Sequence, residues 1–166
     1  MEENYEDLKT ATYYFQHLFS EELVFPKFDV DSKEELFEKI AARLLEENYV
    51  EPSFFQGLLE REINFPTGLR TTPIHVAIPH TDPEHIRTPF IAVIKPTACI
   101  RFYEMGSDDI EVQAQIIFVL GLHKSADQVP LLQGLMEMFM DEKTMEKLIA
   151  STDSKEILSF IQNQMN

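Results

Sequence analysis

The distribution of proline constrains the fold of this chain more than any other feature. Six of the nine prolines in the 166-residue sequence fall between Pro66 and Pro96. Proline has no backbone N–H and is poorly tolerated inside helices and central strands. This part of the chain is therefore expected to form loops and short strands, with candidate strands at residues 74–78, 90–94 and 99–102.

Helical patterns lie on both sides of the proline-rich region. Ser32 and Glu35 have the spacing of a helix-starting capping box, and apolar residues then recur at helical spacing. A second helix is expected to begin near Pro52, which a first turn tolerates, and to run towards Arg61. After Gly121 the pattern is helical again, with one apolar face predicted from five residues: Val129, Leu132, Leu135, Met136 and Phe139. Two further helices are expected to begin at Asp141–Glu142 and Asp153–Ser154.

Two further segments are predicted as strands. Residues 18–25 form the first, and residues 110–122 begin with apolar–polar alternation and end in a continuous apolar run. The second pattern favours a strand at a sheet edge, exposed at one end and buried at the other. Together these elements predict a single α/β domain at residues 18–166, with a small mixed β-sheet flanked by helices. Residues 1–17 are expected to form an N-terminal extension.

Charge and cysteine content narrow the class of protein. The chain carries 14 basic and 29 acidic side chains, a net charge of −15. Such a surface repels nucleic acid and anionic membranes, and it suits either a basic protein partner or simple solubility. No apolar run approaches the ~20 residues that span a bilayer, and the N-terminus lacks a secretory pattern. The lone Cys99 excludes an internal disulfide, so we expect a cytoplasmic protein without direct membrane insertion.

His80 is the main candidate for chemistry. It follows the apolar run Val76–Pro79, with Arg61 and a Pro66–Gly68 turn upstream. A neutral imidazole, with an ordinary pKa of ~6.5, is a competent nucleophile and can carry a phosphoryl group. A lone histidine after an apolar strand is more often structural, so these residues alone leave both roles open.

These segments resemble the enzyme IIA components of the sugar phosphotransferase system, of the mannitol/fructose type. The matching residues are Arg61–Glu62 at a helix end, Pro66–Gly68 in a turn and Ala77–His80. The resemblance implies that His80 accepts the phosphoryl group and that Arg61 lies beside the phosphate. The planar guanidinium of arginine suits that role because it can form two hydrogen bonds to phosphate oxygens. By the same resemblance Thr67 could offer a hydroxyl or backbone N–H.

The sequence departs from the mannitol and fructose branches near the site. Thr81 stands where a small residue usually follows the histidine. Those branches also carry a second histidine in the segment after the last strand, where this sequence aligns Gln128. His123 lies five residues earlier and is the alternative. The missing second histidine and the Phe65–Gly68 segment are similar to the galactitol-type branch.

The resemblance implies a phosphocarrier that receives the group from phosphorylated HPr and passes it to a cysteine of a IIB protein. It implies no metal ion or cofactor, and transport of galactitol or a related sugar. A regulatory domain of the same fold, which senses the phosphoryl state without serving a transporter, is the alternative. Of the remaining candidates, His75 is expected on a strand and His85 in a loop, and neither as a metal ligand. Cys99 is expected in the core.

Overall fold

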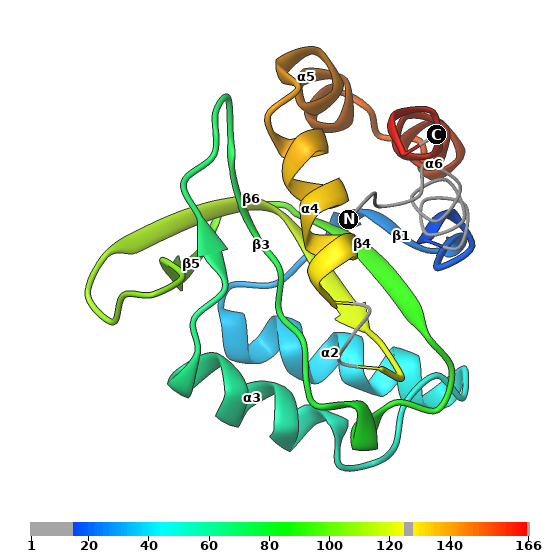
Figure 1. Ribbon diagram of the computed structural model, residues 1–166, viewed down its shortest axis with the longest axis vertical. Helices are drawn as coiled ribbons and strands as arrows, with labels where there is room; N and C mark the ends of the chain where they lie inside the picture. The colour runs from blue at the N-terminus through cyan, green and yellow to red at the C-terminus, as the bar shows by residue number, and fades with distance from the viewer. Residues whose placement is uncertain (1–14, 125–127, 166) are drawn as a thin grey trace, which may run out of the picture.

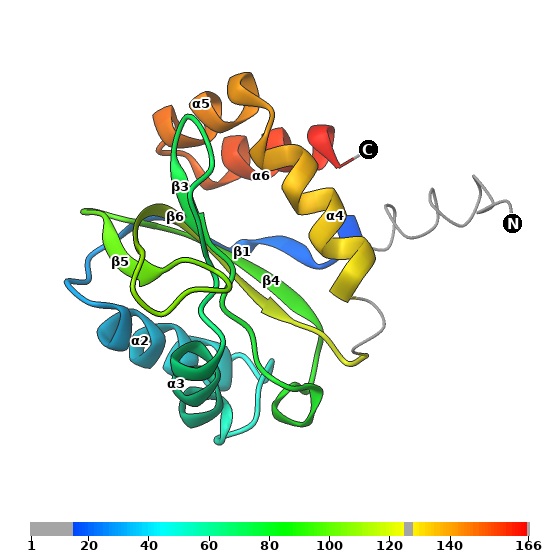
Figure 2. The ribbon, with the colours of Figure 1, turned by 60° about the vertical axis from the view of Figure 1, so that its left-hand side comes forward.

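The computed structural model describes residues 15–124 and 128–165. A mixed six-stranded sheet lies between two layers of helices (Figures 1 and 2), which confirms the predicted α/β class. The elements in chain order are β1 (Phe19–Phe28), α2 (Lys33–Glu46), α3 (Phe54–Asn64), β2 (Gly68–Leu69), β3 (His75–Ala77), the 3-10 turn η1 (Pro83–His85), β4 (Phe90–Pro96), β5 (Ile100–Tyr103), β6 (Glu111–Gly121), α4 (Gln128–Phe139), α5 (Glu142–Ala150) and α6 (Ser154–Gln164).

Strand β6 is the centre of the sheet. The strand order is β1-β4-β6-β3-β2, and β5 pairs with β6 as well. Strand β6 runs antiparallel to β4 and β5 and parallel to β3. The predicted edge position was therefore wrong. Its alternating half, where Glu111 and Gln113 are exposed, pairs with β5, and only the side chains of Val112 and Ala114 face the α2–α3 core.

Two apolar cores explain the continuous apolar sequence of the central strands. One core lies between the sheet and helices α2 and α3, and the other between the sheet and helices α4, α5 and α6. In β4, Phe90, Ala92 and Ile94 face the first core, while Ile91 and Val93 face the second. A strand buried on both faces has no need for polar alternation.

Side-chain caps set the helix starts as the sequence predicted. The Ser32 hydroxyl accepts from the Glu35 N–H at 3.1 Å, and the Glu35 carboxylate accepts from the Asp31 N–H at 3.4 Å. Asp141 and Asp153 cap α5 and α6. Each cap satisfies a backbone N–H that has no partner inside its helix.

The apolar face predicted for α4 was partly wrong. Val129 is 63% exposed, and the residues buried in the core are Leu131, Leu135, Met138 and Phe139. Spacing alone fits both faces here, because most of the helix is apolar. Cys99 was also misplaced, since it is exposed in the turn between β4 and β5.

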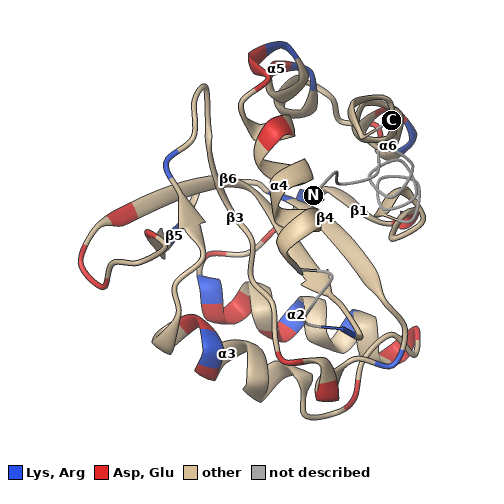
Figure 3. Cartoon of the chain, in the orientation of Figure 1, with Lys and Arg blue, Asp and Glu red and all other residues tan. Residues whose placement is uncertain are grey.

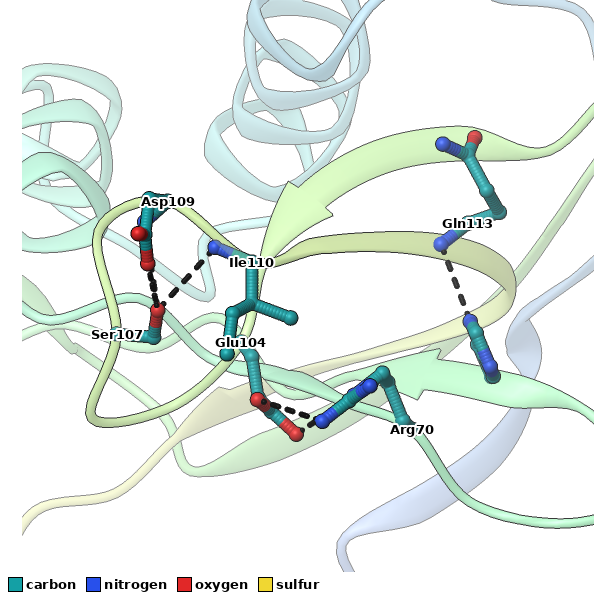
Figure 4. A network of polar contacts seen from close by, with 7 residues as sticks. Arg70, Glu104, Ser107, Asp109, Ile110 and Gln113 are labelled. Carbon is teal, nitrogen blue, oxygen red and sulfur yellow. Dashed lines mark hydrogen bonds and ion pairs between the residues drawn. The ribbon is translucent and has the colours of Figure 1, made fainter.

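Polar contacts hold the β2 and β5–β6 region together (Figure 4). The Arg70 guanidinium donates to both carboxylate oxygens of Glu104 at 2.9 and 3.2 Å. The Ser107 hydroxyl donates to Asp109 and accepts from the Ile110 N–H, which shapes the turn into β6. These contacts fix β2, and with it the turn that precedes the histidine-bearing segment.

Two further expectations concern the N-terminal extension and the membrane. Most of the predicted extension, residues 1–14, lies outside the described residues, but Phe15 is buried in the core between the sheet and helices α4, α5 and α6. Within residues 15–124 and 128–165, the helices are too short or too polar to cross a membrane.

Candidate active site

His80 lies where the ends of two strands meet. It follows β3 and forms a parallel bridge with Leu120 of β6, and the Leu120 N–H donates to the Pro79 carbonyl at 3.0 Å. A small pocket opens there, lined by His80, Thr81, Leu120, Leu122 and Leu132. Leu132 comes from α4, which packs over this end of the sheet (Figure 1). The histidine therefore faces a largely apolar recess.

One hydrogen bond determines the tautomer of His80. Its Nδ1 lies 2.8 Å from the Ile78 carbonyl oxygen. A carbonyl only accepts, so Nδ1 carries the proton and Nε2 keeps its lone pair. Burial lowers the pKa of His80 below its ordinary 6.5, and the Arg61 charge acts in the same direction, against the Ile78 bond and the Asp82 charge. The ring is thus a neutral nucleophile with Nε2 as the reactive atom.

Arg61 lies in the last turn of α3. Its Nη1 is 3.2 Å from the Asp82 carboxylate, and its guanidinium carbon is 5.3 Å from the centre of the Phe65 ring. Its Nε is buried and has no hydrogen-bond partner in the part of the chain that the structure describes. The structure thus places a cation with an unused donor close enough for its charge to act on the pKa of His80.

The two hydrogen-bond donors of Thr67, which the resemblance assigns to a phosphate, contact a carboxyl group of the protein. Its backbone N–H and hydroxyl both donate to the buried carboxylate of Glu62, at 2.7 and 2.6 Å. The Thr67 carbonyl accepts from the Ile78 N–H at 3.2 Å. Both Thr67 donors are therefore engaged, and the residue links Glu62 to the backbone that holds His80.

The sequence predicted no role for Glu62, which was noted only as part of the Arg61–Glu62 pair. Burial raises its pKa to about 7, although the two Thr67 bonds and the charges of Lys33 and Arg61 act in the opposite direction. A buried carboxyl next to an arginine is a feature that periodicity does not reveal. The sequence shows only an acidic residue near the end of a helix, and the structure shows that this position faces the interior.

The second-histidine position is only partly described. His123 is exposed, and its Nε2 donates to the Arg87 carbonyl at 2.7 Å. That contact directs the ring to the loop before β4, and the preceding residue, Leu122, is the one that lines the pocket. Gln128 begins α4, but its side chain lies outside the described residues.

Asp82 received no role from the sequence, and Thr81 was noted there only as a departure from the usual small residue. Asp82 is exposed and pairs with Arg61, and Thr81 is buried with its hydroxyl donating to the Asp82 carbonyl at 3.1 Å. Arg61 and Asp82 are 21 residues apart, so only the fold brings them together. The described residues contain no cluster of three or more His, Cys, Asp or Glu side chains that could hold a metal ion.

Known proteins are similar to this chain in sequence and in fold. The galactitol-specific EIIA component of Escherichia coli K12 is 26% identical over 123 residues, which are 74% of this chain and 81% of that protein. The mannitol-specific enzyme IIA component of Halalkalibacterium halodurans is 26% identical over 148 residues, 88% and 95% of the two chains. In fold, the chain is similar to enzyme IIA-Mtl in its complex with phosphorylated enzyme IIB-Mtl from Escherichia coli. There the TM-score is 0.70 at 24% identity, covering 88% of this chain and 99% of the other.

The profile of one protein family extends over almost all of the chain. It matches residues 17–164, which include every site residue described above. This chain therefore belongs to the EIIA type 2 family of the phosphoenolpyruvate-dependent sugar phosphotransferase system.

Proposed function

We propose that the protein carries a phosphoryl group on Nε2 of His80, received from phosphorylated HPr and passed to a cysteine of a sugar-specific IIB protein. Family membership supports a phosphocarrier role in a sugar phosphotransferase system. The proposal extends it to this donor, this acceptor and this atom, in the cytoplasm. Galactitol or a related sugar is the proposed cargo, on the basis of the galactitol-specific relative.

The observation that carries the proposal is the fixed tautomer of a neutral His80 near Arg61. The bond from Nδ1 to the Ile78 carbonyl leaves the Nε2 lone pair available, and the lowered pKa of His80 keeps the ring uncharged near neutral pH. A purely structural histidine would need neither a nearby arginine with unused donors nor an adjoining pocket.

The transfer step balances without a cofactor. The Nε2 lone pair forms a bond to phosphorus while the bond between phosphorus and the donor breaks, and the donor keeps that electron pair. The proton on Nδ1 stays in place, so the phosphorylated ring is formally cationic, which makes it a good donor in the next step. Arg61 offsets the charge on the phosphoryl oxygens, so positioning and charge stabilisation supply the catalysis.

The surroundings of the site suit a protein partner. Helix α4 carries one charged residue, Glu137, and is almost free of acidic or basic colour in Figure 3. Val129 lies one turn before the pocket residue Leu132 and is 63% exposed, as is Phe65 beside Arg61. Exposed apolar side chains next to a reactive residue are typical of surfaces where another protein docks.

Labelling tests the proposal directly. Incubation with labelled phosphoenolpyruvate, enzyme I and HPr is expected to give a phosphoramidate that is stable in alkali and labile in acid. His80→Gln should lose all label, while His75→Gln should keep it, since the His75 ring accepts from the Gln113 N–H on a partly exposed strand. Label that survives in His80→Gln would overturn the assignment.

Onward transfer of the label distinguishes a phosphocarrier from a regulatory domain of the same fold. A phosphocarrier for galactitol should pass the label to the cysteine of a galactitol-specific IIB protein faster than to that of a mannitol-specific one. A chain that takes label on His80 but passes it to no IIB protein would instead support the regulatory alternative.

A further inference from the structure

We propose that Asp82 sets how tightly the site holds the phosphoryl group, because it occupies Arg61 before phosphorylation and competes with the phosphoryl oxygens afterwards. The inference rests on the proposed function of His80. It assigns Asp82 as a positioning residue, which acts through Arg61 and forms no bond to phosphorus.

The two partners in this ion pair differ in freedom. The Asp82 side chain is 68% exposed, whereas that of Arg61 is 29% exposed and packs over the Phe65 ring. When a new anion arrives, the aspartate can therefore rotate into solvent at little cost while the arginine stays in position. Asp82 holds the guanidinium in the free protein and yields it to the phosphoryl oxygens.

The backbone of Asp82 is anchored even though its side chain is exposed. The Asp82 carbonyl accepts from the Thr81 hydroxyl at 3.1 Å and from the His85 N–H at 3.3 Å. His85 is in turn held at the start of α3, with its Nδ1 2.7 Å from the Ser53 hydroxyl and its carbonyl accepting from the Glu51 N–H at 2.9 Å. The backbone of Asp82 is thus held in place close to the reactive histidine, and only its side chain is free to move.

Charge balance gives the direction of the effect. In the free protein a neutral His80 lies beside one cation, Arg61, and one anion, Asp82. A transferred phosphoryl group adds one net negative charge to the ring and its oxygens together. With Asp82 present, these three groups then sum to −1, whereas a neutral residue at position 82 would bring the sum to zero. Asp82 therefore disfavours the phosphorylated state and promotes onward transfer.

The test is the equilibrium of phosphoryl exchange between HPr and this protein. Asp82→Asn removes the charge with almost no change in shape, and we expect it to shift the equilibrium towards the phosphorylated protein by about two- to fivefold, as suits an exposed ion pair. Onward transfer to IIB should slow correspondingly. The shift should shrink in 0.5 M salt, because screening weakens exposed charges.

Three variants control for other causes. Asp82→Ser must move the equilibrium in the same direction as Asp82→Asn, because it also removes the charge. Asp82→Glu keeps the charge and should behave as wild type. Glu84→Gln removes an equal charge two residues away, from a side chain that is 75% exposed and contacts His85 instead of Arg61, and it should leave the equilibrium unchanged.

A second readout needs no phosphorylation. Because the Asp82 charge raises the pKa of His80, Asp82→Asn should lower the pKa measured for this ring by NMR titration, and Glu84→Gln should not. Equal exchange equilibria in Asp82→Asn and wild type, or an unchanged His80 pKa, would overturn the inference. A wild-type protein that takes no label on His80 would overturn the proposed function instead.

Discussion

Glu62 accepts two hydrogen bonds from Thr67, one from the backbone N–H at 2.7 Å and one from the hydroxyl at 2.6 Å. This contact joins the last turn of α3 to the turn before the histidine-bearing segment. From Thr67 the hydrogen bonds continue to the Ile78 N–H, and from the Ile78 carbonyl to Nδ1 of His80. A buried carboxyl is thereby linked to the orientation of the reactive ring.

The raised pKa of Glu62 predicts a specific dependence of stability on pH. Burial holds this pKa at about 7, against an ordinary 4.5. Between these two values the folded state binds the proton more tightly than the unfolded state. Its contribution to the free energy of unfolding is therefore complete below pH 4.5 and is lost as the pH rises towards 7, by at most about 3 kcal/mol.

Urea unfolding of wild type and Glu62→Gln at pH 5 and pH 8 measures this contribution. The stability of wild type relative to the variant should fall as the pH rises, because glutamine does not titrate. Glu60→Gln on the exposed side of the same helix is the matched control, since the Glu60 carboxylate accepts a hydrogen bond from the Gln56 amide at 2.9 Å. A pH-independent difference for Glu62→Gln would contradict the prediction.

Removing the Arg61 guanidinium should slow phosphoryl transfer while leaving the protein folded. A hydrogen bond to a charged group contributes ~1.5–3 kcal/mol, which corresponds to roughly 10- to 150-fold in rate. We therefore expect Arg61→Ala to reduce the rate of transfer to His80 by a factor in this range. The transfer rate of Arg61→Lys should lie between those of wild type and Arg61→Ala, because lysine keeps the charge but not the planar donor pair.

The control for Arg61 is Arg87→Ala. Arg87 is exposed and donates to both carboxylate oxygens of Glu51, so it has a comparable ion pair, but its partner is Glu51 instead of Asp82. Its loss should leave transfer unchanged. Equal rates in Arg61→Ala and Arg87→Ala would show that Arg61 is an ordinary helix-end arginine.

Gly68 is required by close packing of two strands. A Cβ at this position would lie 2.6 Å from the Tyr103 carbonyl oxygen and 2.9 Å from Val112 side-chain atoms. Backbone cannot move aside as a flexible side chain can, so we expect Gly68→Ala to lower the free energy of unfolding by about 1–3 kcal/mol. Slower transfer should accompany it, because Gly68 follows Thr67 in the hydrogen-bonded chain.

Gly134→Ala in α4 provides the comparison for Gly68. Its added Cβ would meet only the flexible end of Met165, at 3.3 Å, and alanine is the better helix former by up to about 1 kcal/mol. This variant should be as stable as wild type or slightly more so. Urea unfolding of the two variants side by side measures the difference, and equal destabilisation would contradict the packing argument.

Helix starts that have strong local signals could be predicted from the sequence. Which elements pack beside one another could not. The capping residues Ser32, Asp141 and Asp153 act on backbone groups within one turn, so their roles follow from local spacing. The position of β6 depends on which strands lie beside it. Alternation at its start indicated an exposed face but said nothing of its pairing with β5.

The same division applies to the candidate site. His80 and Arg61 were predicted as site residues because they lie in a sequence motif, and in the structure the Arg61 charge acts on the pKa of His80. Thr67 was expected to face the phosphate, but Glu62 takes up both of its donors. Asp82 reaches Arg61 only through the packing of η1 against α3. Residues that are brought into contact by the tertiary fold have no characteristic separation in the sequence, so spacing does not predict such contacts.

The second-histidine position gives the last prediction. The His123 ring donates to the Arg87 carbonyl at 2.7 Å, so it holds the loop before β4 and is not expected to contact the phosphoryl group. We therefore expect His123→Ala to change the rate of transfer to IIB by no more than about twofold, as for an ordinary exposed substitution. Gln128→Ala should slow it by roughly tenfold if the Gln128 amide donates to the phosphoryl oxygens.

Rates for the two variants, measured side by side with phosphorylated wild type as reference, decide between the two alignments of this segment. Because His123→Ala also removes a contact to the Arg87 loop, its unfolding free energy should be measured with the rate, so that a loss of stability is not taken for a loss of chemistry. His123→Gln keeps a donor that can reach a carbonyl, and it should behave as wild type. A large loss of transfer in both His123 variants, with little in Gln128→Ala, would place His123 at the phosphoryl group and overturn the assignment of Gln128.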